Sequence, residues 1–142
     1  MRELYADTGF WLAISLRRDQ HNPLARKFLS SFDAKTRIVT SELVLIEYLN
    51  HFSRSDSETR KEIITRWRKL RSDDSITIVP AGDALIDKAA TLFERSSDKA
   101  WSMTDCASFV IMQDRGIVDA LTNDHHFEQA GFQALLRLDD GE

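Results

Sequence analysis

Short β-prone segments alternate with longer amphipathic segments along this chain. Strands are predicted where apolar and β-branched side chains gather between polar residues, at 3–6, 37–39, 75–79, 118–122 and 132–136. Helices are predicted where apolar side chains recur at helical spacing, at 10–16, 41–52, 57–71, 82–95 and 104–115. A further helix is expected to open at Asn22 and Pro23, a suitable pair for a cap and a first turn.

This alternation predicts an α/β fold. Strands joined by helices of this length pair in parallel, and helices cover both faces of such a sheet. The expected architecture is a three-layer α/β/α sandwich with a central parallel sheet. Only five glycines and two prolines are present and no linker is visible, so residues 1–142 are expected to form a single domain. A binding site is sought at the carboxyl ends of the strands.

Composition narrows the class of protein. With 142 residues, 42% of them hydrophobic and 30% charged, the chain can bury one sizeable core. It contains no apolar run long enough for a membrane span and no N-terminal pattern typical of a secretory signal, so no membrane association is expected. The single cysteine, Cys106, excludes an internal disulfide, and the expected location is the cytoplasm. Residues 139–142 are expected to form a short polar tail.

The charge balance limits how this protein can meet nucleic acid. Its net charge of −4 argues against binding by bulk positive charge alone. A protein that meets phosphate groups through a bound cation remains compatible with that charge. The informative acids are therefore those that interrupt apolar surface, because an ionised carboxylate is costly to bury without a partner.

Two such acids lie at the start of predicted helices. Asp7 ends the first strand and precedes an apolar segment, and Asp105 heads a stripe that continues with Phe109 and Met112. Each also has a purely structural interpretation. Asp7 alone would serve as a helix cap, and Asp105 with Ser102 resembles a capping box.

Glu47 lies in the predicted helix at 41–52, whose apolar side chains wrap most of its circumference. This helix is therefore expected to be buried nearly all round. Glu47 shares a narrow polar wedge with Asn50 and His51, which either lines a polar cavity or faces solvent.

Asp124 follows the fourth strand, on the same face as Thr122 if the strand ran on, and either joins the site or serves a turn. Asp119 points the other way, and Asp114 lies opposite Asp105 on its helix, so both are excluded from the candidate site.

All four acids fall near the carboxyl ends of strands or on adjoining helices, which favours a single site. Two carboxylates about 4 Å apart repel by roughly 4 kcal/mol at an effective dielectric of 20, so their convergence requires a cation. Oxygen ligands of this kind suit Mg²⁺ or Mn²⁺. The candidate metal and catalytic residues are Asp7, Glu47, Asp105 and Asp124.

The order and spacing of four motifs resemble the PIN domain family, and within it the VapC-type toxins of prokaryotic toxin–antitoxin pairs. The motifs run across almost the whole chain: Asp7-Thr8, the block 40–47 ending in Glu47, Thr104-Asp105, and the block 121–127 with 130–132 behind it. Gly9 departs from the family, where a small polar residue is common, and Cys106 stands where alanine is frequent. Neither departure removes an expected metal ligand.

The resemblance implies a metal-dependent nuclease that hydrolyses RNA phosphodiester bonds and leaves a 5′-phosphate and a 3′-hydroxyl. It implies metal ligation by the four acids, with hydroxyl support from Thr8, Thr104 and Thr122. The implied partners are an RNA substrate, an antitoxin protein and a second copy of the chain in a homodimer. Two alternatives stay open: a PIN nuclease of RNA maturation or turnover without an antitoxin, and a catalytically inactive PIN-like interaction module.

Substrate contacts are less defined by the sequence. Residues 54–71 carry seven basic against three acidic side chains, which either guide a phosphate backbone or form a solvated helix face. The apolar stripe of Ile63, Ile64, Trp67 and Leu70 is expected to pack in the core, and any exposed part would suit a homodimer or an antitoxin segment. No role is assigned to His51, His125 or His126.

Overall fold

The strands form one parallel five-stranded sheet in the order β3-β2-β1-β4-β5. The computed structural model describes residues 1–138, so the polar tail expected at 139–142 lies outside the described residues. The strands are β1 (Arg2–Ala6), β2 (Thr36–Ser41), β3 (Ile76–Val79), β4 (Asp119–Leu121) and β5 (Gln133–Ala134). All five fall within or close to the predicted segments, although β5 is shorter than expected.

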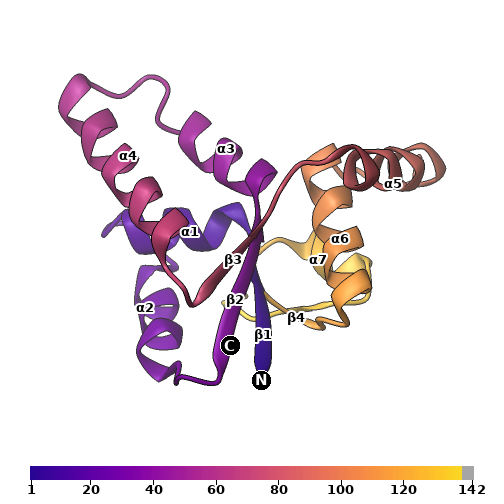
Figure 1. Cartoon of the computed structure of the whole chain (residues 1–142), viewed down its shortest axis with the longest axis horizontal. Helices are drawn as coiled ribbons and strands as arrows, with labels where there is room; N and C mark the ends of the chain where they lie inside the picture. Colours follow the sequence, from indigo (N-terminus) through magenta and orange to yellow (C-terminus); the bar gives the residue numbers. More distant parts are fainter. Residues whose placement is uncertain (139–142) are drawn as a thin grey trace.

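Helices cover both faces of this sheet. Figure 1 shows α1, α2 and α4 on one side of the strands and α5, α6 and α7 on the other, while α3 contacts α1 and α4. The predicted three-layer α/β/α sandwich is therefore confirmed. The helices are α1 (Thr8–Ser15), α2 (Asn22–Ser31), α3 (Glu42–Asn50), α4 (Ser57–Ser72), α5 (Asp83–Arg95), α6 (Met103–Arg115) and α7 (His125–Gln129).

The core is built around the central strand β1 and helix α6. Leu4, Tyr5 and Ala6 are fully buried, as expected for a strand that is covered on both faces. Helix α6 is buried without interruption from Asp105 to Met112. Its Phe109 meets Phe127 of α7 edge to face, with ring centroids 4.9 Å apart, which fixes the short helix against the long one.

Helix α3 corrects one expectation. It was expected to be buried nearly all round, but Ile46 is 50% exposed and Glu47 is exposed as well. Only Val44, Leu45 and Tyr48 are buried. The reason is geometric: α3 packs against α1 and α4, and its Leu43 meets the small cluster of Ala89, Cys106 and Ala107, and these contacts leave Ile46 and Glu47 exposed.

The cap expected at Asn22 is also wrong. Asn22 is the first residue of α2, and its side-chain amide donates to the Ala13 carbonyl at 2.7 Å instead of capping the helix. The fourth strand is shorter than predicted, because Val118 lies outside it with its side chain largely exposed. Helix α7 occupies a segment that the sequence had indicated only as a turn. The helix has only five residues, and Asn123 and Asp124, which precede it, are residue types that are also typical of turns.

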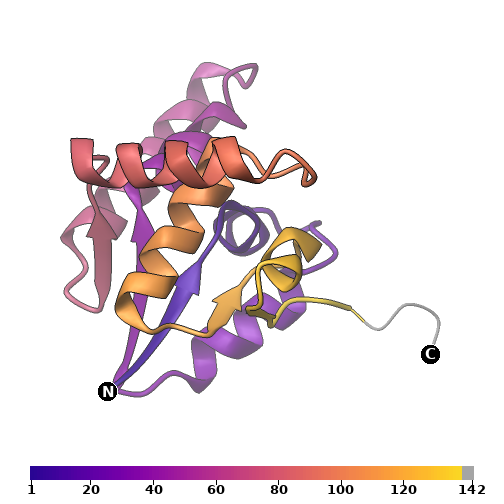
Figure 2. The same cartoon turned by 90° about the vertical axis from the view of Figure 1, so that its right-hand side faces the viewer.

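The strand order places a topological switch between β1 and β4. From β1 the chain moves to β2 and then β3 through α1 to α4, whereas β4 lies on the other side of β1 and continues to β5 through α7. Figure 2 shows the arrowheads of β1 and β4 pointing the same way, with α1 and α7 beyond their tips. In open α/β sheets, ligands bind at the carboxyl ends of the strands beside such a topological switch. None of the helices in residues 1–138 has the length and hydropathy needed to cross a membrane.

Candidate active site

The carboxyl ends of β1 and β4 are joined through one hydroxyl group. Thr122 follows β4, is fully buried, and donates from Oγ1 to Oδ2 of Asp7 at 3.0 Å. The same Oγ1 accepts the backbone N–H of Asp124 at 3.1 Å. Asp7 and Asp124, 117 positions apart in the sequence numbering, therefore share a hydrogen-bonding partner at the topological switch.

Asp7 is the most perturbed acid of the site. Burial raises its pKa from 3.8 to about 7, and the negative charges of Asp105 and Glu47 act in the same direction. Hydrogen bonds from the Thr8 backbone and the Thr122 hydroxyl only partly oppose this increase. Asp7 occupies the N-cap position of α1 but makes no side-chain capping bond, so a cap alone does not account for it.

Asp105 combines a structural and a potential chemical role. It closes the capping box predicted for α6, because its Oδ2 accepts the Ser102 N–H at 3.0 Å while its own N–H donates to Ser102 Oγ, also at 3.0 Å. Oδ2 also lies 3.0 Å from Nδ1 of His126. The cap holds the carboxylate at the start of α6, where it raises the pKa of Asp7.

Glu47 reaches the site from α3. Its Oε1 accepts a hydrogen bond from Thr8 Oγ1 at 3.1 Å, so the residue after Asp7 positions this carboxylate. Glu47 and its polar neighbours Asn50 and His51 are exposed, so the Glu47 side chain approaches the other acids from the solvent side. Thr8 and Thr122 thus both hydrogen-bond to candidate acids of the site. The hydroxyl of Thr104 forms no hydrogen bond with these carboxylates in residues 1–138.

His126 is the contact that sequence reasoning missed. Its Nδ1 lies 3.0 Å from Asp105 Oδ2 and 3.4 Å from Asp124 Oδ1, so its ring lies between two of the acids. Its backbone N–H donates to Asp124 Oδ1 at 2.9 Å. The only sequence signal was its position, two residues after Asp124, because the helix α7 that orients the ring was not predicted.

A family model settles which family of proteins shares this arrangement. The model of the PIN domain matches residues 4–133, nearly the whole chain. This chain belongs to the PIN domain family. The match spans β1 to β5 and therefore includes all four acids of the site. Among curated proteins, no sequence matches this PIN domain significantly.

A solved structure shows the same fold. The PIN domain described here superposes on the crystal structure of Mycobacterium tuberculosis VapC20, a toxin described as cleaving the Sarcin-Ricin loop, with a TM-score of 0.80. The two share 24% sequence identity over 91% of this chain and 95% of that chain. At this identity the likeness shows the fold alone.

The donor set of this PIN domain fits a hard divalent cation. Asp7, Glu47, Asp105 and Asp124 offer carboxylate oxygens, the ligands that Mg²⁺ and Mn²⁺ prefer. The pKa of Asp7 is raised first by burial of its carboxyl group and, to a smaller extent, by the negative charges of Asp105 and Glu47. A cation held there would lower the cost of ionising Asp7, which is the behaviour expected of a ligand.

Proposed function

We propose that this PIN domain is a divalent-metal-dependent endoribonuclease and the toxin of a toxin–antitoxin pair. The single observation that carries the proposal is the link from Asp7 through Thr122 to Asp124, which unites acids from the two ends of the chain at the switch point of the sheet. Family membership and the likeness to a ribonucleolytic toxin support the reaction class. The proposal covers residues 1–142 as one domain.

In the proposed mechanism, Asp7, Glu47, Asp105 and Asp124 hold Mg²⁺ or Mn²⁺. An ion held by these side chains would supply Lewis-acid chemistry at the scissile phosphodiester and would make a water molecule there more acidic. Thr122 keeps Asp7 Oδ2 in place, and Thr8 does the same for Glu47 Oε1. Burial of Asp7 excludes water from one side of the site. Hydrolysis leaves a 5′-phosphate and a 3′-hydroxyl.

The decisive experiment compares cleavage of labelled RNA in Mg²⁺, in Mn²⁺ and in EDTA. Cleavage is expected with either ion and not with EDTA. Asp7→Asn and Asp105→Asn are expected to lower the rate at least about 100-fold, because each neutralises a proposed metal ligand. Asp114→Asn is the matched control: this exposed acid also lies on α6, pairs with Lys88 at 3.2 Å and lies outside the site. Equal, measurable rates in all four proteins would contradict the proposal, and absence of cleavage by the parent would favour an inactive PIN-like module instead.

The structure supports a place for the antitoxin. Ile46 and Leu49 of α3 and Trp67 of α4 line a groove of about 500 Å³ beside the edge strand β3. Arg71 stacks over the Trp67 ring, 4.7 Å from its centroid, and gives the groove one cationic edge. The proposed occupant is an apolar antitoxin segment with an acidic residue beside Arg71. Co-expression with the product of an adjacent small gene, scored by growth rescue and stable co-purification, tests this pairing.

A further inference from the structure

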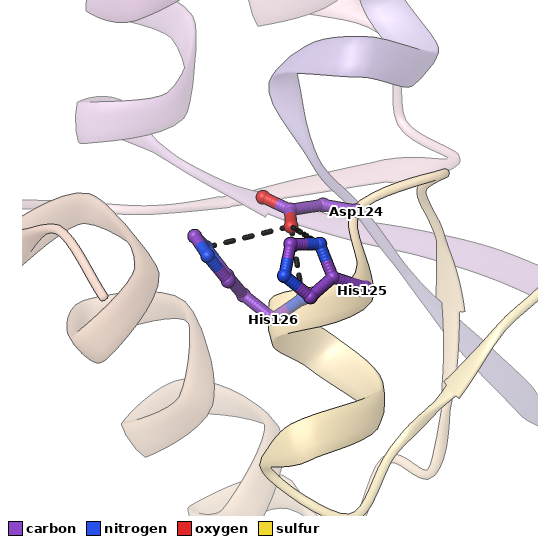
Figure 3. A group of neighbouring side chains, drawn as sticks. All are labelled: Asp124, His125 and His126. Atoms are coloured by element: carbon purple, nitrogen blue, oxygen red, sulfur yellow. Dashed lines mark hydrogen bonds and ion pairs between the residues drawn. The ribbon is translucent and has the colours of Figure 1, made fainter. Parts of the chain in front are cut away.

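Asp124, His125 and His126 form a second set of metal donors that overlaps the carboxylate site. Their ligand atoms, one carboxylate oxygen and two imidazole nitrogens, all lie within 4.8 Å of one another. Figure 3 shows both imidazole rings on the side where the Asp124 carboxylate projects. This set contains two nitrogens, whereas the proposed catalytic set consists of carboxylates alone.

The distances match those of a bound transition-metal ion. Asp124 Oδ1 lies 3.4 Å from His126 Nδ1 and 3.7 Å from His125 Nδ1. In a tetrahedral zinc site with bonds of about 2.0–2.1 Å, neighbouring ligand atoms lie about 3.3 Å apart. The two distances from Asp124 Oδ1 are therefore close to those around one ion, and the third donor pair lies within 4.8 Å.

The local backbone favours this arrangement. Asp124 is the N-cap of α7, and its Oδ1 accepts the His126 N–H at 2.9 Å, so the helix start fixes the carboxylate. The His125 side chain is 61% exposed, while that of His126 is 19% exposed and lies against Asp105 and Asp124. Three protein donors leave the fourth position of a tetrahedral site open for water, as in zinc sites with three protein ligands.

We propose that Asp124, His125 and His126 bind a borderline transition-metal ion, with Zn²⁺ as its representative, in preference to Mg²⁺. Imidazole nitrogen suits Zn²⁺, whereas Mg²⁺ prefers oxygen ligands and keeps its waters. Cys106 does not compete for the ion, because it is fully buried in α6.

This zinc site is coupled to the carboxylate site in two ways. Asp124 belongs to both donor sets, so the two ions compete for it. Zinc on Nδ1 of His126 also removes the 3.0 Å contact between that nitrogen and Asp105 Oδ2. Zinc therefore inhibits the Mg²⁺-dependent reaction, and this consequence rests on the function proposed above.

The first test measures binding alone. The full, untagged chain is titrated calorimetrically with Zn²⁺ in the absence of Mg²⁺ and RNA, and one zinc per chain is expected. His125→Gln is expected to weaken zinc binding at least about tenfold, because it removes a direct ligand and its exposed side chain makes the variant safe for folding. His51→Gln, at an exposed histidine after α3, is the matched control and is expected to bind zinc like the parent. Absence of binding, or equal affinity in parent and His125→Gln, overturns the proposal.

The second test separates this proposal from the nuclease proposal. Asp7→Asn is expected to keep zinc affinity, because Asp7 lies outside the cluster, while it loses Mg²⁺-dependent cleavage. In the parent, one equivalent of zinc is expected to suppress cleavage relative to the zinc-free rate, and in His125→Gln the same zinc concentration is expected to suppress it far less. If the parent binds zinc but never cleaves RNA, the nuclease proposal fails and the zinc site stands. If it cleaves RNA but binds no zinc, the reverse holds.

Discussion

Thr122 Oγ1 donates to Asp7 Oδ2 at 3.0 Å, just beyond the carboxyl ends of the paired strands β4 and β1. The same oxygen accepts the N–H of Asp124, so one hydroxyl sets the position of two acids. Because a buried hydrogen bond holds the Asp7 carboxylate and the same hydroxyl holds the Asp124 backbone, this part of the site is organised before any ligand arrives.

Replacing Thr122 is expected to damage both stability and metal binding. Thr122→Val keeps the shape and leaves the Asp124 N–H without its partner, which costs about 1–3 kcal/mol of unfolding free energy. Thr40→Val is the matched control, since buried Thr40 donates to the Ala6 carbonyl of the neighbouring strand β1 and accepts from the indole N–H of Trp11 in α1. Denaturant unfolding should show a similar loss in both variants. A loss of Mn²⁺ affinity is expected only for Thr122→Val, and an equal loss in Thr40→Val would contradict a specific role.

Ionisation of Asp7 is expected to make the metal-free protein less stable as the pH rises. Its folded pKa of about 7 lies above the ordinary value of 3.8, so its favourable contribution is complete below pH 4 and is lost between pH 4 and 7. The increase corresponds to roughly 4 kcal/mol at most. The unfolding free energy measured in EDTA should therefore fall over this pH range in the parent relative to Asp7→Asn. Parallel pH profiles for the two proteins would disprove the buried-charge explanation.

Metal binding is expected to reverse that loss. At about one hundred times its dissociation constant, a ligand that binds only the folded state stabilises it by roughly 2.7 kcal/mol. Mg²⁺ or Mn²⁺ should therefore raise the melting temperature of the parent, and EDTA should restore the lower value. Asp114→Asn should respond like the parent, whereas a response in Asp7→Asn as large as that of the parent would exclude Asp7 as a ligand.

The groove beside β3, lined by Ile46, Leu49 and Trp67, is expected to bind the antitoxin. Ile46→Lys places a charge on an exposed apolar position of the groove, so it should abolish co-purification with the antitoxin without unfolding the toxin. Phe93→Lys is the control, because Phe93 is 48% exposed on α5 in the other helical layer. Circular dichroism verifies folding of both variants, and loss of co-purification in Phe93→Lys alone would move the interface to α5.

The basic side chains of α4 are expected to contribute to RNA affinity. Lys61 and Arg68 line a shallow groove of about 610 Å³ on this helix. The double variant Lys61→Gln, Arg68→Gln should weaken RNA binding at all sequences and reduce the slope of log affinity against log salt by about 1–2. Arg95→Gln with Lys99→Gln, the control double variant, removes the same charge at the last residue of α5 and in the segment that follows it. Equal salt slopes in the two double variants would show that the basic side chains of α4 form a solvated helix face and do not contact RNA.

The pattern of apolar residues was sufficient to predict the architecture. Alternation of short strands and longer helices requires parallel pairing, and the location of Asp7 and Asp124 just beyond β1 and β4 follows from strand boundaries. Helix α7 was missed because five residues contain too little periodicity to distinguish a helix from a turn. The exposure of Ile46 was missed because periodicity reports which side chains are apolar and not which neighbours reach them.

The sequence by itself therefore determined the layers of the fold, the family resemblance and the four candidate acids, because these depend on local patterns and their order. Only the tertiary structure decided that Thr122 connects Asp7 to Asp124, that His126 lies between Asp105 and Asp124, and that His125 completes a second donor set. Such contacts join residues that no periodicity relates. They exist because the strand order brings β1 beside β4 and because α7 turns its first two side chains toward the acids.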